Sequence, residues 1–288
     1  MITGRRDFVR IALAGLAATA GAQGRNWKHK GVRLGVGTFS FRGLPFDEVV
    51  RIATAAGIGG IELESAHLEP NVPPAGRREA IRQWRLSVPM TEIAVAKRRL
   101  RAAGAEVYAY NCGLDDASTE PEIERVVEIT KALGAGILNT SMTLTTARRA
   151  APLAARHGIR LGLHPSGNAN DPNSIGTGAS YLKAFEIGPN VGANPDLYQY
   201  RNWGPDPVAF LKQHHARITT LHFHDRKLTP AAWAPFGEGD MPLKELLLLA
   251  RREKYQFPFS VERIYTVPNL DQVKEIERSL AYCRSLLD

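Results

Sequence analysis

Short apolar runs rich in β-branched residues recur along the chain and alternate with longer segments of helical period. Runs of the first kind predict buried strands, and segments of the second kind predict amphipathic helices. The predicted strands span residues 33–37, 59–64, 106–111, 135–140, 160–164, 191–196, 218–224 and 257–263. The clearest predicted helices span residues 46–56, 90–103, 120–133, 145–157, 243–253 and 273–287.

Strands that alternate with helices imply a parallel sheet, and eight such strands can close into a barrel. The first four of these predicted helices each end directly before a glycine, which commonly ends a helix in the left-handed conformation. An open doubly wound sheet is the alternative, but no G-x-G-x-x-G motif follows a predicted strand. We therefore predict an α/β fold, a single-domain (β/α)8 TIM barrel over residues 31–288, preceded by a short segment, 23–30.

The longest connections after predicted strands span residues 65–89, 165–178, 197–207 and 225–241, and they are rich in Pro, Gly, Asn and Trp. In a barrel of this kind, such connections build the face at the carboxyl ends of the strands, where barrel enzymes keep their active sites.

Ionisable residues stand at or near the ends of several predicted strands. They are Glu62, Glu64, His164, Asp196, His222, His224 and Glu262. Side chains alternate along a strand, so residues two apart share a face and can enter the barrel. Any one of them could be a satisfied structural residue, but unpartnered buried carboxylates each cost several kcal/mol. Together they predict a divalent cation, and mixed nitrogen and oxygen donors suit Mn²⁺, Zn²⁺, Co²⁺ or Fe²⁺ better than Ca²⁺.

The first 22 residues have the pattern of an export signal. Arg5 and Arg6 precede an apolar run over residues 11–16, and Ala20-Gly21-Ala22 follows. This resembles a twin-arginine signal with an A-x-A cleavage site, which predicts an interaction with the twin-arginine export machinery and a periplasmic location. A buried N-terminal helix is the alternative interpretation. The apolar run is too short to span a bilayer, so we expect no stable membrane insertion.

The charge of the chain gives only a weak indication of partners. The net charge is +8, of which the leader contributes three arginines and one aspartate, leaving about +6. The remaining cations are scattered among acids without an aromatic–basic stripe, so we predict no nucleic-acid partner. Cys112 and Cys283 are predicted to be free thiols. The oligomeric state stays open.

Several segments resemble one known family in the same order along the chain. The early runs 34–41 and 57–63 (G-I-G-G-I-E-L) resemble the opening of the xylose-isomerase-like TIM barrels of the sugar phosphate isomerase/epimerase group. That group includes tagatose and allulose epimerases, inosose dehydratase and endonuclease IV. The later runs 191–196, 221–227, 235–243 and 259–262 resemble its aspartate, L-H-x-K-D-R, G-x-G-D and final glutamate motifs.

The resemblance implies a set of metal ligands. Epimerases of this group use Glu, Asp, His and Glu from strands five to eight, which places Asp196, His222 and Glu262 as ligands here. His164 stands where the first glutamate is typical, and we expect it to be the fourth ligand. Smaller departures are His224 in place of a frequent lysine and Gln199 in place of a frequent histidine.

The loss of one carboxylate affects the expected mechanism. In the epimerases the fifth- and eighth-strand carboxylates move a proton at carbon, so His164, Glu262 and Glu64 are the candidate catalytic residues here. Of these, Glu64 is the preferred base or substrate-positioning residue, with His164 as a ligand. Contacts with a carbohydrate substrate are expected from Glu62, His67, His224, Trp203 and Trp233, although loop tryptophans often serve packing alone.

These expectations favour a metal-dependent sugar or polyol isomerase or epimerase that moves a proton next to a carbonyl. One alternative is a lyase or hydrolase that cleaves 3-keto-glycosides by metal-assisted elimination. Another is a non-catalytic carbohydrate-binding barrel. DNA repair in the manner of endonuclease IV is disfavoured, because that branch uses more histidine ligands and an exported protein does not meet genomic DNA.

Overall fold

The protein is described by a computed structural model that covers residues 24–165, 168, 170–199, 206–264 and 269–288. The predicted leader, 1–22, and Trp203 lie outside the described residues. The predictions made for them therefore stay predictions.

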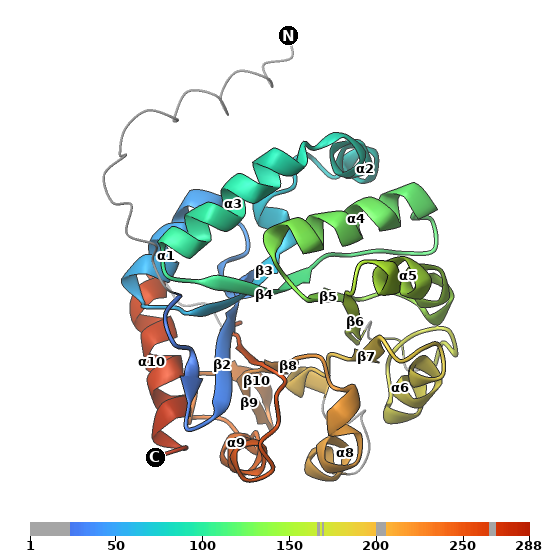
Figure 1. The fold of residues 1–288 in the computed structure, drawn as a ribbon. Helices are drawn as coiled ribbons and strands as arrows, with labels where there is room; N and C mark the ends of the chain where they lie inside the picture. Colours follow the sequence, from blue (N-terminus) through green and yellow to red (C-terminus); the bar gives the residue numbers. More distant parts are fainter. Residues whose placement is uncertain (1–23, 166–167, 169, 200–205, 265–268) are drawn as a thin grey trace.

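Parallel strands form the barrel wall that the sequence predicts, and helices surround it (Figure 1). In the described part of the chain the wall order is β7-β6-β5-β4-β3-β2-β11-β8. Isolated parallel bridges from Ala193 to Ile218 and from Asp196 to His222 join β7 to β8 and close the circle. The wall strands are β2 (Val32–Gly37), β3 (Gly60–Glu64), β4 (Glu106–Asn111), β5 (Ile137–Thr140), β6 (Arg160–Leu163), β7 (Val191–Ala193), β8 (Leu221–Phe223) and β11 (Phe259–Val261). The prediction of a TIM barrel is confirmed.

The six helices with predicted ranges agree with those ranges to within a residue or two at each end. The described helices are α1 (Phe46–Ala55), α2 (Arg77–Ser87), α3 (Met90–Ala102), α4 (Glu120–Leu133), α5 (Leu144–Arg156), α6 (Gly178–Phe185), α8 (Pro207–His214), α9 (Leu243–Arg252) and α10 (Gln272–Ser285). Of these, α2, α6 and α8 had no predicted range. Gly104 and Gly134, which follow α3 and α4, have φ angles of 85° and 84°, as helix-ending glycines require. Among the described helices, none is long and apolar enough to cross a membrane.

The two faces of the barrel wall differ in polarity. Aliphatic residues such as Val36, Ile61 and Leu161 occupy the outward positions and are fully buried in the core. On the inward positions, polar side chains meet across the axis instead. Asn139 on β5, for example, donates a hydrogen bond of 2.8 Å to Thr220, just before β8. The barrel interior is therefore a polar, hydrogen-bonded core.

The segment before β2 packs against the amino-terminal end of the barrel. The backbone N–H of Arg25 donates to the carbonyl of Gly104 at 2.8 Å, and β1 (Lys28–His29) pairs antiparallel with β2. The Trp27 ring lies against Gly60, where any Cβ atom would come within 2.5 Å of the indole. The glycine at this position therefore lets the tryptophan approach β3 closely.

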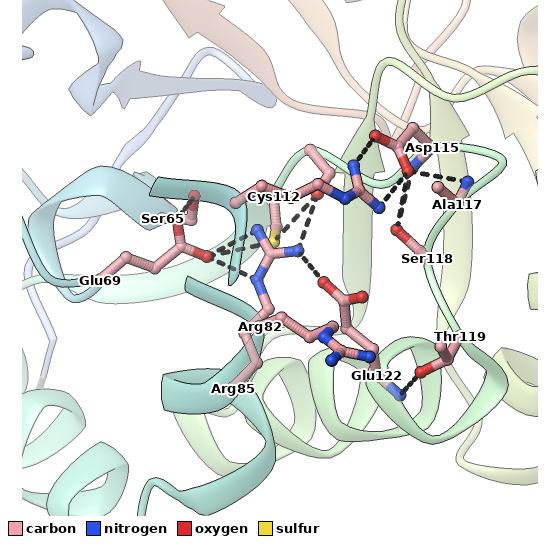
Figure 2. A network of polar contacts seen from close by, with 12 residues as sticks. Ser65, Glu69, Arg82, Arg85, Cys112, Asp115, Ala117, Ser118, Thr119 and Glu122 are labelled. Carbon is pink, nitrogen blue, oxygen red and sulfur yellow. Dashed lines mark hydrogen bonds and ion pairs between the residues drawn. The ribbon is translucent and has the colours of Figure 1, made fainter. Parts of the chain in front are cut away.

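Helix α2 lies within the long connection 65–89, for which the sequence predicts no helix. It buries Arg85 rather than an apolar stripe, which explains why a search for hydrophobic period misses it. Arg85 reaches between Glu69 and Glu122 of α4, at 2.7 and 2.8 Å (Figure 2). It also donates to the carbonyl of Gly113, at 3.1 Å. This buried ion-pair group ties α2 to α4 and to the connection after β4.

The two cysteines, Cys112 and Cys283, are free and buried, which confirms the prediction made for them. Burial raises the pKa of both thiols well above the ordinary value, so neither is a reactive thiolate near neutral pH.

Candidate functional site

The strand ends bring together the four residues predicted to bind a cation. His164 follows β6, Asp196 follows β7, His222 lies within β8 and Glu262 follows β11. One ligand atom from each of His164, Asp196 and His222 lies within 4.8 Å of the others. Glu262 Oε1 lies 3.7 Å from His222 Nδ1. The set is compact enough to surround one small volume.

These residues line a cavity of about 460 Å³ at the carboxyl ends of the strands. It also contacts Phe39, Glu64, Asn111, Ser141, Gln199 and Trp233. A larger cavity of about 930 Å³ lies at the opposite end, beside Trp27 and Pro258. None of the predicted site residues that the structure describes lines the larger cavity, so we place the candidate site in the smaller one.

Asp196 is the hub of the cluster. Its Oδ1 lies 2.7 Å from His224 Nε2, and its Oδ2 lies 3.2 Å from His164 Nε2. Burial tends to raise the pKa of Asp196, but the charge of His224 and hydrogen bonds from His164, His222 and His224 hold it well below its ordinary value. The Asp196 carboxylate is therefore ionised throughout the physiological range.

His222 has its two ring nitrogens in different surroundings. Nε2 lies 2.8 Å from Glu62 Oε1, whereas Nδ1 faces Asp196 Oδ2 at 3.8 Å and Glu262 Oε1 at 3.7 Å. Burial lowers the pKa of His222, but the charges of Glu262 and Glu62 outweigh it and raise the pKa well above its ordinary value. Without a cation, the His222 imidazole between Glu62 and Glu262 therefore holds its second proton.

Glu262 supplies the observation that tests the fit of a cation. The side chain is buried, and its Oε1 has no hydrogen-bond partner among the described residues. Burial, with Glu62, Asp196 and Glu64 adding to it and His222 opposing it, raises the pKa of Glu262 to about 8. A buried carboxylate oxygen without a donor, beside an imidazole nitrogen and a second carboxylate, fits a divalent cation. The donor set of two imidazoles and two carboxylates suits Mn²⁺, Zn²⁺, Co²⁺ or Fe²⁺.

The two glutamates of β3 lie at different depths. Glu64 lines the cavity, and burial together with the charges of Glu62 and Glu69 raises its pKa to about 8. Glu62 is buried beneath His222 and also accepts a hydrogen bond from Ser260, at 2.9 Å. The placement of Glu64 is compatible with the predicted base. Glu62 therefore has protein partners on both carboxylate oxygens, and its predicted substrate contact stays a prediction.

Two further histidines predicted to bind substrate also have protein partners. The ring nitrogens of His67 lie 2.9 Å from the Leu44 carbonyl and 3.1 Å from the Thr38 carbonyl. His224 contacts Asp196 and packs edge-on against Trp233 at 4.7 Å. Of the predicted site residues that the structure describes, Glu62, His67 and His224 do not line the cavity. Strand position gives the direction of a side chain but not its depth.

A hairpin that the sequence analysis missed carries Trp233 to the cavity. It consists of β9 (Asp225–Leu228) and β10 (Ala231–Ala234), within the connection predicted as a loop. The buried Asp225 carboxylate accepts hydrogen bonds from the backbone N–H groups of Gly237 and Gly239, at 2.9 and 3.0 Å. These bonds fold residues 235–241 against the hairpin, whose Trp233 lines the cavity.

Other cavity residues were also missed by the sequence analysis. Ser141 directly follows β5, and its Oγ lies 2.9 Å from His164 Nδ1. The strand-end rule that selected His164 would have selected Ser141 as well, had hydroxyls been considered. Phe39 lies in a short 3-10 turn, Thr38–Phe41, after β2, and no side-chain pattern in that segment marks it.

Comparisons with known proteins agree with this architecture. The sequence profile of the Xylose isomerase-like TIM barrel family matches residues 50–286. No curated protein sequence matches the chain. D-allulose 3-epimerase from Methylomonas sp., solved with D-allulose, is similar at a TM-score of 0.65 and 15% identity, over 92% of this chain and 99% of that one.

Two further solved structures are similar. The 3-keto-D-glucoside 4-epimerase YcjR from E. coli has a TM-score of 0.63 and 17% identity, over 88% of this chain and 99% of that one. A sugar phosphate isomerase/epimerase from Parabacteroides distasonis has a TM-score of 0.59 and 18% identity, over 93% and 96%. At these identities the structures show a common fold, and the profile match shows the family. The chain belongs to the Xylose isomerase-like TIM barrel family.

Proposed function

We propose that this protein is a divalent-cation-dependent isomerase or epimerase of a sugar or polyol, working by proton transfer next to a carbonyl. The observation that carries the proposal is the buried Glu262 Oε1, which has no hydrogen-bond donor among the described residues and faces His222 Nδ1 beside an open cavity. His164, Asp196, His222 and Glu262 would hold the cation. When bound, it would polarise a substrate carbonyl and acidify the neighbouring C–H bond.

The protein's own groups provide the remaining requirements. Glu64 lines the cavity and is the candidate base. Its pKa is raised to about 8, and a general base works best when its pKa lies near the pH of the reaction. Trp233 and Phe39 offer apolar walls that would orient a sugar ring and keep bulk water from the reacting carbon. Return of the proton to a different carbon or face would complete isomerisation or epimerisation.

Elimination from a 3-keto-glycoside is the second candidate function. His164 favours this function, because it stands where the resemblance leads us to expect a second carboxylate that transfers protons. The imidazole of His164 also contacts Asp196 and Ser141. With one carboxylate base, removal of the C–H proton would be followed by departure of the β-substituent with its bonding electrons. The similarity to a 3-keto-D-glucoside epimerase supports a substrate of this type.

One experiment tests the proposal and separates the two reactions. We would measure the metal content of protein purified from cells, and incubate it in heavy water with free ketoses and with 3-keto-glucosides. We expect a bound divalent cation and deuterium at the carbon next to the carbonyl. Isomeric products would indicate isomerisation, and a released aglycone would indicate elimination. Protein that binds no divalent cation and exchanges no proton with added Mn²⁺, Zn²⁺, Co²⁺ or Fe²⁺ would refute the proposal.

We further propose that the protein acts outside the cytoplasm. Residues 1–22, with Arg5 and Arg6 before a short apolar run, support this location. A periplasmic enzyme would meet free or glycosidic sugars rather than phosphorylated ones.

A further inference from the structure

A continuous series of hydrogen bonds runs along the barrel axis below the candidate cation site. The Tyr108 hydroxyl donates to Ser260 Oγ at 2.9 Å, and Ser260 Oγ donates to Glu62 Oε2 at 2.9 Å. The other oxygen, Glu62 Oε1, lies 2.8 Å from His222 Nε2. We call Tyr108, Ser260 and Glu62 the axial chain. It joins residues of β4, β11 and β3 to the imidazole on β8.

The axial chain is buried and fixed from below. Ser260, Glu62 and His222 are exposed by 0%, 1% and 3% of their surface, so bulk water does not replace these bonds. The Tyr108 ring stacks on Trp27, with centroids 5.0 Å apart and planes 17° apart. A Cβ atom at Gly35 would clash with the Tyr108 ring, so the glycine on β2 makes room for the phenol. The position of the tyrosine hydroxyl is therefore set by packing.

The direction of these bonds determines which nitrogen of His222 carries a proton. Tyr108 and Ser260 both donate toward Glu62, and an ionised carboxylate only accepts. His222 Nε2 lies 2.8 Å from Glu62 Oε1 and 3.1 Å from the side-chain amide of Asn194, and the nearer, charged acceptor places the N–H on this nitrogen. In the neutral imidazole the lone pair is then on Nδ1, the atom that faces Asp196 and Glu262.

We propose that the axial chain positions His222 for cation binding, with Nε2–H held by Glu62 and Nδ1 as the ligating atom. The inference rests on the proposed function, because it assumes that a cation occupies the site. It assigns Tyr108 and Ser260, which are remote from the cavity, as positioning residues. Outer-shell partners of this kind typically change metal affinity by about 10- to 100-fold when they are removed.

The chain offers closely matched controls for a test. Tyr108→Phe removes one hydroxyl and keeps the ring that stacks on Trp27. Tyr110→Phe makes the same change two residues away on the same strand, where the buried hydroxyl has no hydrogen-bond partner among the described residues. Ser260→Ala removes the central hydroxyl, and Ser279→Ala removes a buried hydroxyl that donates to the Glu275 carbonyl within α10. Ser260→Thr restores a hydroxyl at the centre of the chain.

The experiment measures the dissociation constant for Zn²⁺ by competition with a chelator, using metal-free full-length protein. We expect Ser260→Ala to weaken Zn²⁺ binding by about 10- to 100-fold. Tyr108→Phe should weaken it by a smaller factor, and Ser260→Thr should restore most of it. Tyr110→Phe and Ser279→Ala should match the parent. Nitrogen-15 chemical shifts of His222 in the zinc-loaded parent should identify Nδ1 as the bound atom.

The possible outcomes separate this inference from the proposed function. If the parent binds Zn²⁺ and both Tyr108→Phe and Ser260→Ala bind it equally well, the axial chain has no positioning role, while the cation site stands. Zinc bound through Nε2 of His222 would also overturn the inference alone. If the parent binds no divalent cation, the proposed function and this inference fall together. If the Ser260→Ala variant does not fold, the Zn²⁺ affinity of Tyr108→Phe alone tests the positioning role, because this variant keeps the aromatic ring that stacks on Trp27.

Discussion

Replacing Glu262 by glutamine should make the metal-free protein more stable at alkaline pH, although it removes a predicted cation ligand. The carboxyl is buried, and its Oε1 has no hydrogen-bond partner among the described residues. Burial, reinforced by neighbouring carboxylates and opposed by His222, raises its pKa from an ordinary 4.5 to about 8. The folded protein therefore holds a proton that the unfolded chain has already released.

The sign and size of the effect follow from this difference. Between pH 4.5 and about 8 only the folded state is protonated at Glu262, so its contribution to the unfolding free energy falls as pH rises. Each pH unit costs about 1.4 kcal/mol, which gives an upper limit of roughly 5 kcal/mol across the window. Glutamine cannot ionise, so the variant loses this slope. A cation bound to the parent would add about 3 kcal/mol at one hundred times the dissociation constant, which offsets the loss over about two pH units.

Urea unfolding followed by circular dichroism, on chelator-treated protein at steps from pH 5 to pH 8.5, would measure the effect. The control is Glu277→Gln, an exposed glutamate on α10. We expect the curves of parent and Glu262→Gln to lie close together at pH 5 and to separate steadily above it, with the variant more stable. Parallel curves across the whole range would refute the reasoning, because the carboxyl would then be as well solvated in the fold as in the unfolded chain.

Three further predictions concern the cation, the base and the leader. Asp196→Ala should lose the cation and the activity together but keep the barrel fold, because a core of this size does not need the metal. Elemental analysis measures the metal and circular dichroism measures the fold. Stoichiometric metal in the variant would contradict the prediction that Asp196 is a ligand. Glu64→Gln should keep the metal and lower turnover and deuterium exchange by about 10²–10⁴-fold, and unchanged exchange would move the role of base to Glu262. Replacing Arg5 and Arg6 by lysine should block export, and a normal periplasmic yield on cell fractionation would show that the pair is not read as a twin-arginine signal.

The fold was largely predictable because its strands and most of its helices have clear hydrophobic periods. Residues 106–111 were predicted as a strand and form β4 with the same bounds. Helix α2 was missed because Arg85, paired with Glu69 and Glu122, takes the place of an apolar stripe. The hairpin β9–β10 was missed because the Asp225 carboxylate, bonded to backbone N–H groups distant in sequence, organises that connection. Polar contacts between residues distant in the chain produce no periodic pattern of hydrophobic residues in the local sequence.

The site was predictable in direction and less so in depth. The rule that strand ends meet brought together His164, Asp196, His222 and Glu262, because all strands of a parallel barrel end on one face. The same rule placed Glu62 with them, yet it lies below His222, one inward position deeper than Glu64. Depth depends on how strands stagger around the barrel, and a single sequence carries no signal for that stagger.

The seam between β7 and β8 links the site to the local opening of the barrel wall. In the described part of the chain, two isolated bridges close this seam, and Asp196 and His222 form one of them. Backbone bonds across it run from the Thr219 N–H to the Ala193 carbonyl and from the His222 N–H to the Pro195 carbonyl, at 2.8 and 2.9 Å. A ligand held by both side chains would connect the two sides of a seam that isolated bridges, and no continuous ladder, pair in the described residues. Loss of that ligand would then increase hydrogen exchange at Thr219 and His222 first, as a local loosening well below the cost of global unfolding.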